Sequence, residues 1–242
     1  VATVLGYVVS TIIALIQLFL TKQKVKPVFK NCLEPQMIKL IFSYGLPSFV
    51  MNALGAFTVN FANMFLVRYS DTAVAFFGAY FKVQQLIFMT VNGLIQGCLP
   101  IMRFNYRAKE YGRLKQANKS GTIIATVMMI VGMLLVLIFP KEILFLFSAS
   151  EEMCAFGVPA MRIMSLGFVF SGFSAMIATY EQATDSIMPG VVVQLLRQGV
   201  LLVPVIWLLN SAVQMTGIWL AFPITEFVTF LVAVVFAKIK NH

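Results

Sequence analysis

A row of polar side chains runs along one apolar stretch of the sequence, residues 78–100. If the stretch is an α-helix, its spacing keeps the row within one side of that helix. The polar members of the row are Lys82, Gln85, Asn92 and Gln96. Such a row does not face acyl chains, because an ionised side chain at the centre of a bilayer costs at least ~2.5–3.5 kcal/mol. We therefore predict that it faces water or another helix. Gln84 lies off the row and is given no role.

Two other apolar stretches carry polar side chains in their interior. Asn52 and Asn63 project to nearly one side of residues 42–67, and Glu226 lies inside residues 215–237. Ionisable residues well inside apolar spans are candidates for a substrate or proton pathway. We predict that these three residues and the polar row line such a pathway.

Structural roles for the same residues remain open at this point. Asn and Gln side chains join membrane helices by hydrogen bonds, worth about 0.6 kcal/mol per pair. Glu226 could be a structural carboxylate paired with Lys82 or Arg197, and Lys82 could extend its ammonium group to the membrane surface.

The sequence lacks the motifs of several enzyme classes. The single histidine is His242, and no GxxxxGK[ST], HExxH or GxSxG motif occurs. The cysteines are isolated from one another and are interpreted as small apolar residues of the core; they are Cys32, Cys98 and Cys154. We expect no enzyme activity, no metal site and no cofactor, and any transport would be driven by an ion gradient.

The composition is that of a membrane protein. Hydrophobic residues make up 60% and charged residues 11% of the chain, whereas soluble domains are about 25% charged. One soluble core could not bury this much apolar surface. The net charge of +9 comes from short basic clusters between apolar runs, so it does not indicate a nucleic-acid partner.

About seven apolar stretches reach the roughly 20 residues that a membrane-spanning helix needs. They are approximately 1–21, 42–67, 73–102, 120–140, 154–180, 188–210 and 215–237. Because lipid leaves backbone polar groups unsatisfied, only helices or closed barrels span membranes, and runs this long without period-two alternation indicate helices. We predict an all-α, polytopic membrane helix bundle in which the interior prolines Pro204 and Pro223 kink their helices.

The basic residues fix an orientation. They concentrate in the connections 22–41 and 103–119 and in the tail after residue 237, and basic loops stay in the cytoplasm. The first helix should therefore run from outside to inside. We expect a multi-pass protein of the cell membrane with a cytoplasmic C-terminus.

Several segments resemble the multidrug and toxic compound extrusion (MATE) family, and its MepA-like and DinF-like branch most closely. A Q-G-x-x-P-[IL] run ends at Ile101, and a basic stretch beginning Asn105-Tyr106 follows it. The further similar segments are YEQATDSIMPG, LLRQGVLLVPVIWLL, TGIWLAFPITEF and the opening GLPSF. Their order and spacing are similar to the family over about residues 45–230.

The resemblance implies a division of the chain. Residues 1–21 would be the last helix of an N-terminal lobe, 22–41 a basic cytoplasmic linker, and 42–242 a six-helix C-terminal lobe. The chain would then be part of a longer protein whose partner is the missing N-terminal lobe. The implied function is a secondary active antiporter that exports cationic or amphiphilic small molecules by alternating access between the two lobes.

The coupling ion and the function have alternatives. A glutamate of the related NorM-like branch corresponds to Gly55 here, which argues against sodium coupling through that carboxylate and leaves H⁺ or Na⁺ as the coupling ion. One rival function is a flippase for lipid-linked oligosaccharides, which would need several cationic residues in its cavity. The other rival is a membrane scaffold that transports nothing.

Overall fold

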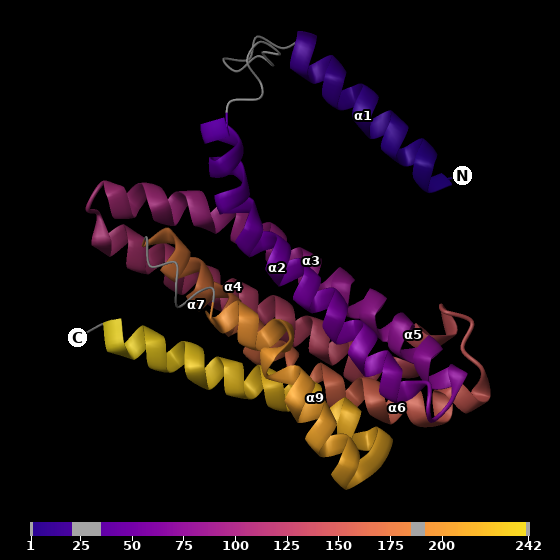
Figure 1. The fold of residues 1–242 in the computed structure, drawn as a ribbon. Helices are drawn as coiled ribbons and strands as arrows, with labels where there is room; N and C mark the ends of the chain where they lie inside the picture. Colours follow the sequence, from indigo (N-terminus) through magenta and orange to yellow (C-terminus); the bar gives the residue numbers. More distant parts are fainter. Residues whose placement is uncertain (1, 21–34, 185–191, 241–242) are drawn as a thin grey trace. The chain divides into compact units, whose positions relative to one another are not determined.

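The structure is a computed structural model in which all described elements are helices (Figure 1). It describes residues 2–20, 35–184 and 192–240, except for the side chains at 2–3, 19–20, 36, 40, 43–48, 50–52, 198 and 237–240. The chain divides into two compact units, 1–48 and 49–242. The first contains α1 (Ala2–Leu20), and the candidate site lies wholly in the second.

The remaining elements follow in chain order. They are α2 (Pro35–Leu66), α3 (Asp71–Arg107), α4 (Tyr111–Ile138), α5 (Pro140–Phe145), α6 (Glu151–Ser165), α7 (Phe168–Ala183), the π-helical turn η1 (Leu196–Val200) and α9 (Leu202–Lys240). Helix α3 packs on α4, α4 on α7, and α7 on α9. Figure 1 shows these long helices running beside one another.

Capping side chains define where two of the helices begin. The Ser70 hydroxyl accepts a hydrogen bond from the backbone N–H of Ala73 at 3.0 Å, at the start of α3. The Ser150 hydroxyl does the same for Met153 at 3.2 Å, at the start of α6. Each cap satisfies an N–H group that the first helical turn leaves unpaired, so the starts of α3 and α6 are fixed by local sequence.

An aromatic cluster joins the first half of α3 to the middle of α9. The Phe76 ring meets the Trp219 ring edge-to-face at 5.2 Å, and Phe77 packs on Phe222 at 5.8 Å. Phe76, Phe77 and Trp219 are at most 3% exposed. Edge-to-face pairs add roughly 0.5–1.5 kcal/mol beyond area burial, so this cluster holds the two helices that carry the site.

Four described segments are long and apolar enough to cross a membrane. They are Asp71–Arg107, Tyr111–Ile138, Glu151–Ala183 and Leu202–Phe236, and two shorter apolar helices occur at Val4–Leu18 and Ala53–Leu66. Many large apolar side chains point outward, such as Ile123 and Val131 of α4, which are 54% and 51% exposed. Lipid accounts for this exposure, and the predicted all-α membrane bundle is confirmed at this level.

The boundaries of the helices differ from the predicted spans. Helix α2 begins at Pro35, inside the predicted linker 22–41, most of which lies outside the described residues. The predicted span 154–180 is two helices, because the regular helix is interrupted at Leu166 and Gly167. A hydropathy profile does not detect such interruptions, since the residues on both sides are equally apolar.

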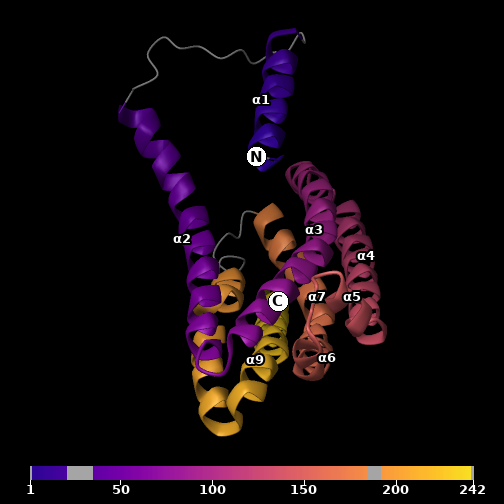
Figure 2. The ribbon, with the colours of Figure 1, turned by 90° about the vertical axis from the view of Figure 1, so that its right-hand side faces the viewer.

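The described chain has one backbone break near Pro204 and another that no proline predicted. Helix α9 is broken at Val213 and Gln214, where Gln214 has φ 53°, and Figure 2 shows the chain reversing direction within α9. The break at Gly199 in η1 lies one turn before Pro204, which is where a proline disturbs a helix, so the backbone is irregular where the Pro204 kink was predicted. No non-helical backbone angles occur at Pro223 among the described residues, and the kink predicted there stays a prediction.

Candidate functional site

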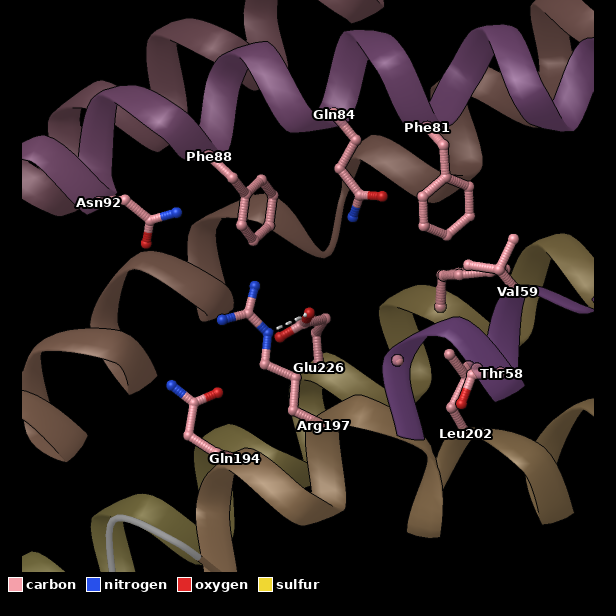
Figure 3. Close-up of a pocket in the computed structure, with 12 residues that line it drawn as sticks. Thr58, Val59, Phe81, Gln84, Phe88, Asn92, Gln194, Arg197, Leu202 and Glu226 are labelled. Atoms are coloured by element: carbon pink, nitrogen blue, oxygen red, sulfur yellow. Dashed lines mark hydrogen bonds and ion pairs between the residues drawn. The ribbon is translucent and has the colours of Figure 1, made fainter. Parts of the chain in front are cut away.

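A polar cavity of about 300 Å³ lies between α2, α3, η1 and α9. Figure 3 shows its lining side chains converging from these elements. The polar and charged lining residues are Thr58, Gln84, Asn92, Gln194, Arg197 and Glu226. Apolar residues, including Phe81, Phe88 and Phe222, complete the wall. We call this cavity the Glu226 pocket.

An ion pair lies at the centre of the Glu226 pocket. Arg197 Nε donates a hydrogen bond to Glu226 Oε1 at 2.9 Å, drawn as the dashed line in Figure 3. The two side chains are only 17% and 14% exposed. Removing one partner of such a partly buried pair is destabilising, because the remaining charge is left unpaired and poorly solvated.

The pairing leaves one side of the carboxylate unused. Glu226 Oε2 is buried and has no hydrogen-bond partner among the described residues. The hydroxyls of Thr225 and Thr229, on the same helix, are likewise buried and unpartnered in the described part of the chain. Buried polar atoms without partners are rare in folded proteins and commonly indicate a water or an ion. The carboxylate can therefore accept a further hydrogen bond or cation.

Arg197 has a second contact, with an aromatic ring of α3. Its guanidinium carbon lies 4.7 Å from the centroid of the Phe88 ring. A guanidinium within about 6 Å of a ring face gains a cation–π attraction of roughly 0.5–2 kcal/mol. The same cation thus links η1 to α9 through Glu226 and to α3 through Phe88.

The backbone around the pair is packed too closely for side chains. A Cβ at Gly167 would lie 3.2 Å from Pro223 Cα and 3.3 Å from Glu226 Cγ. A Cβ at Gly199, in η1, would collide with the Thr58 hydroxyl. These two glycines let α7 approach Glu226 and let η1 approach α2, which positions the two charged residues in one cavity.

The π-helical turn itself carries Arg197. Leu201 N donates to Leu196 O at 3.2 Å, and Gly199 has non-helical backbone angles. This irregularity lies one turn before Pro204, whose ring would clash with the carbonyl four residues earlier in a regular helix. Single π-turns often occur at functional sites. We interpret this one as the element that directs Arg197 toward Glu226.

The structure brings two of the predicted pathway residues together. Asn92 and Glu226 both line the Glu226 pocket. Lys82 instead lines a separate cavity of about 570 Å³ with Asp71, Phe147 and other residues. Of the possible partners for Glu226, the structure has Arg197 and not Lys82.

The other predicted residues lie elsewhere. Gln85 and Gln96 are exposed on α3, and neither is part of the Glu226 pocket. Asn63 is half-buried on α2 with its Oδ1 atom buried and unpartnered among the described residues. The side chain of Asn52 lies outside the described residues. The pathway roles of these residues stay predictions.

Gln84 was set aside from the sequence, yet it lines the Glu226 pocket. The helical spacing explains the oversight. Phe81, Gln84, Phe88 and Asn92 share a sector of about 80° at 100° per residue, and the polar row occupies the neighbouring sector. Asn92 lies at the edge common to both faces. The sequence does not reveal this face as polar, because phenylalanines alternate with polar residues along it.

Metal ligands do not gather in the described part of the chain. No three residues of the types His, Cys, Asp and Glu come together there. Among the described lining of the Glu226 pocket, the carboxylate is Glu226 and the cation is Arg197. The arrangement suits the binding of a small cation or a proton by one carboxylate, with amides and aromatic rings around it.

The sequence was compared with curated proteins. It is 26% identical over 183 residues to "Multidrug export protein MepA" of Staphylococcus aureus (strain MSSA476), covering 76% of this chain and 40% of that protein. It is 27% identical over 207 residues to the protein of the same name from Staphylococcus haemolyticus (strain JCSC1435), covering 85% and 45%. The chain therefore spans less than half the length of these relatives.

Solved structures share the fold. An outward-facing multidrug resistance MATE family transporter of the MOP superfamily aligns with a TM-score of 0.83 at 18% identity, covering 99% of this chain and 55% of that one. The inward-facing conformation of such a transporter aligns with a TM-score of 0.78, also at 18% identity, covering 99% and 56%. At this identity the likeness concerns the fold alone.

The family model provides the assignment. The sequence model of the MatE family matches residues 47–208, which include most of the elements around the Glu226 pocket. This match covers more than half of the chain and agrees with the relatives and with the fold. The chain belongs to the MatE family of multi-pass membrane proteins.

Proposed function

We propose that this chain forms one lobe of a secondary active antiporter that exports cationic or amphiphilic small molecules. The observation that carries the proposal is the Arg197–Glu226 pair inside a polar cavity of the membrane-spanning helices. A charged pair that is this deeply buried is costly to maintain, so a function is its best explanation. The names of the MepA relatives support export as that function.

The geometry suggests how a cation could be bound and released. Glu226 shares one oxygen with Arg197 and keeps the other unpartnered among the described residues. A substrate cation entering the pocket would bind the unpartnered oxygen and compete with Arg197. The displaced guanidinium would keep its contact with Phe88 and find acceptors on Asn92 and Gln194, which also line the cavity. Arg197 would thus act as a built-in competitor of the substrate.

An ion gradient would supply the energy. A proton or a sodium ion that neutralises Glu226 would remove the attraction of this carboxylate for the substrate. The lobe could therefore carry either the coupling ion or the substrate at one time, but not both. The glutamate of the NorM-like branch would correspond to Gly55, which lines the same pocket. Here Glu226 would supply the carboxylate from another helix. Alternating access would come from movement of this lobe against the predicted N-terminal lobe.

The lining is less suited to the other functions considered. A flippase for pyrophosphate-linked lipids would need several free cations in its cavity, whereas Arg197, the cation of the described lining, is paired with Glu226. An enzyme would need a cluster of acids, bases or metal ligands, and the described part of the chain shows no such metal-ligand cluster. A transporter fits the pocket better than either.

The test is efflux of a fluorescent cationic dye from cells that express the full-length protein. We expect Glu226→Gln to slow efflux at least about tenfold, because the loss of a partly buried charge partner typically costs 2–5 kcal/mol. Glu151→Gln, an exposed carboxylate at the start of α6, is the matched control and should leave efflux unchanged. Efflux should be compared at equal amounts of protein in the membrane.

A double variant separates transport from folding. Arg197→Met leaves Glu226 unpaired, whereas Arg197→Met combined with Glu226→Gln removes both charges and restores neutrality. We expect the double variant to recover membrane abundance but not efflux. Recovery of efflux by the double variant would mean that the pair is structural, and the proposed role of Glu226 would be wrong.

A further inference from the structure

A second cavity, of about 600 Å³, lies where α3 ends, α4 begins and α7 ends. It shares no lining residue with the Glu226 pocket. Its lining combines three tyrosines, two lysines and one carboxylate: Tyr106, Tyr111, Tyr180, Lys115, Lys119 and Glu181. We call it the tyrosine cavity. The proposed transport uses none of these residues.

The position of the tyrosine cavity is that of a membrane interface. It lies at the ends of three helices long enough to cross a membrane, and tyrosine is enriched where membrane meets water. The nearby connection carries the basic cluster that predicts the cytoplasmic side. On that topology, the cavity opens at the level of the headgroups of the cytoplasmic leaflet.

One rim of the cavity is basic and continues into an apolar strip. Lys115 and Lys119 are exposed and one helical turn apart on α4. The next two positions in the same row are Ile123 and Val127, which are 54% and 53% exposed. A ligand with an anionic group at the lysines could therefore lay an acyl chain along α4. This continuity favours a lipid over a soluble anion.

The interior of the cavity offers hydrogen-bond acceptors. Glu181 is 2% exposed, and a carboxylate has about four acceptor sites, so it can receive a ligand N–H in addition to the interaction it already has. Asn118 Oδ1 is buried and has no hydrogen-bond partner among the described residues. Two buried acceptors and two exposed lysines in one cavity match a ligand with both an ammonium and a phosphate group.

Aromatic rings support the same charge pattern. Tyr106 and Tyr111 meet edge-to-face with ring centroids 6.3 Å apart, and Tyr180 also lines the cavity. Ring faces attract an ammonium group, while phenolic hydroxyls donate hydrogen bonds to phosphate oxygens. Both ends of a zwitterionic headgroup would thus find partners.

We propose that the tyrosine cavity binds the phosphoethanolamine headgroup of phosphatidylethanolamine from the surrounding membrane. The phosphate lies between Lys115 and Lys119, and the primary ammonium donates to Asn118 Oδ1 and Glu181. Phosphatidylcholine lacks the N–H donors that these acceptors require, and phosphatidylglycerol lacks the ammonium group. The site distinguishes headgroups by hydrogen bonding, and the acyl chain lies against Ile123 and Val127.

The experiment measures which lipids the full-length protein retains. The protein is purified in nanodiscs that contain equal amounts of phosphatidylethanolamine, phosphatidylcholine and phosphatidylglycerol, and native mass spectrometry measures the lipids that stay bound. We expect phosphatidylethanolamine to be retained about tenfold over the other two, the factor that one charge-assisted hydrogen bond provides. Equal retention of all three lipids would overturn the proposal.

Variants assign the two ends of the headgroup. Lys115→Gln with Lys119→Gln should abolish the retention of phosphatidylethanolamine, and Glu181→Gln should remove the preference over phosphatidylcholine. Arg113→Gln, an exposed basic position on α4 outside the cavity lining, is the matched control. If Arg113→Gln reduces retention as much as the lysine pair does, the effect is general surface charge and the site is refuted.

Two further measurements keep the result clear. The thermal unfolding temperature of Glu181→Gln should match that of the wild type. If Glu181→Gln is destabilised, the lysine variants still test the site, because they change exposed residues. Soluble phosphoethanolamine is added as a competitor in a separate arm. Displacement of the bound lipid at equal concentration would show that the ligand is the soluble compound, and the membrane source would be wrong. Dye efflux by Glu226→Gln tests the transport proposal independently.

Discussion

At the scale of single residues, the central feature is a carboxylate with a hydrogen-bond partner at one of its two oxygens. Glu226 bonds Arg197 through one oxygen at 2.9 Å, while the other oxygen is buried and unpartnered among the described residues. A fully satisfied structural ion pair would have partners for both oxygens. This asymmetry supports the proposed binding role of Glu226 over a purely structural one, and it could not be inferred from the identity of the residues.

Gln84 provides a prediction at this scale. Its amide lines the Glu226 pocket, where it can bond a bound cation or the displaced guanidinium. We expect Gln84→Leu to raise the KM for dye efflux about two- to tenfold, the factor that the loss of one hydrogen bond of 0.5–1.5 kcal/mol produces. Gln116→Leu changes an exposed amide of α4 that does not line the pocket and should leave KM unchanged. An unaltered KM for Gln84→Leu would remove this residue from the site.

At the scale of elements, α3 has two different polar faces. One face, with Gln84 and Phe88, closes the Glu226 pocket. The other carries the exposed row that includes Gln85 and Gln96. Gln85 and Gln96 line neither the Glu226 pocket nor the cavity that contains Lys82, so we expect these two residues to face water or the predicted N-terminal lobe. With one face at the Glu226 pocket and the other at the predicted lobe interface, α3 would link the proposed substrate binding to the proposed movement between lobes.

The close approach of α4 and α7 provides a prediction for the elements. A Cβ at Gly172 would lie 3.0 Å from the backbone oxygen of Ala125 and 2.9 Å from Met129 Cγ. Backbone cannot move aside cheaply, so we expect Gly172→Ala to lower the unfolding temperature and to cost about 1–3 kcal/mol through overpacking. Thermal unfolding of the purified protein measures this.

The control for this prediction is on α4 itself. A Cβ at Gly112 would meet nothing within 4 Å, and alanine is the better helix former. Gly112→Ala should therefore leave the unfolding temperature unchanged or raise it slightly. If Gly172→Ala proved as harmless as Gly112→Ala, the helices would not be packed as closely as the structure has them.

At the scale of the whole molecule, the chain spans about half the length of the proteins it resembles. It covers 40% and 45% of two MepA relatives and just over half of the aligned transporter structures. The predicted divisions at 1–21, 22–41 and 42–242 follow the resemblance and stay predictions. The chain's own compact units meet between residues 48 and 49.

Membrane orientation is the prediction at this scale. The basic cluster at 103–119 should lie in the cytoplasm, and the turn between α5 and α6 should lie outside. In a variant without native cysteines, Lys109→Cys should react with an impermeant thiol reagent only after the cells are opened. Ser148→Cys should react in intact cells, since both side chains are exposed. The reverse pattern would invert the topology and move the tyrosine cavity to the outer leaflet.

The sequence by itself indicated that most of the chain lies in lipid, and it indicated the fold class and the family. Continuous apolar runs of about 20 residues without period-two alternation indicate membrane-spanning helices, because lipid satisfies no backbone polar group. Motifs such as the run that ends at Ile101 lie in one continuous piece of chain, so their order could be read directly.

Only the tertiary structure decided which polar residues share a cavity. Arg197 and Glu226 are 29 positions apart, and Gln84 and Gln85 are neighbours that project about 100° apart on a helix. Which of them meets a pocket depends on where neighbouring helices pack. The same holds for the break at Gln214, which lies far from Pro204 and Pro223 and belongs to the turn between two helices, whereas the break at Gly199 lies one turn before Pro204.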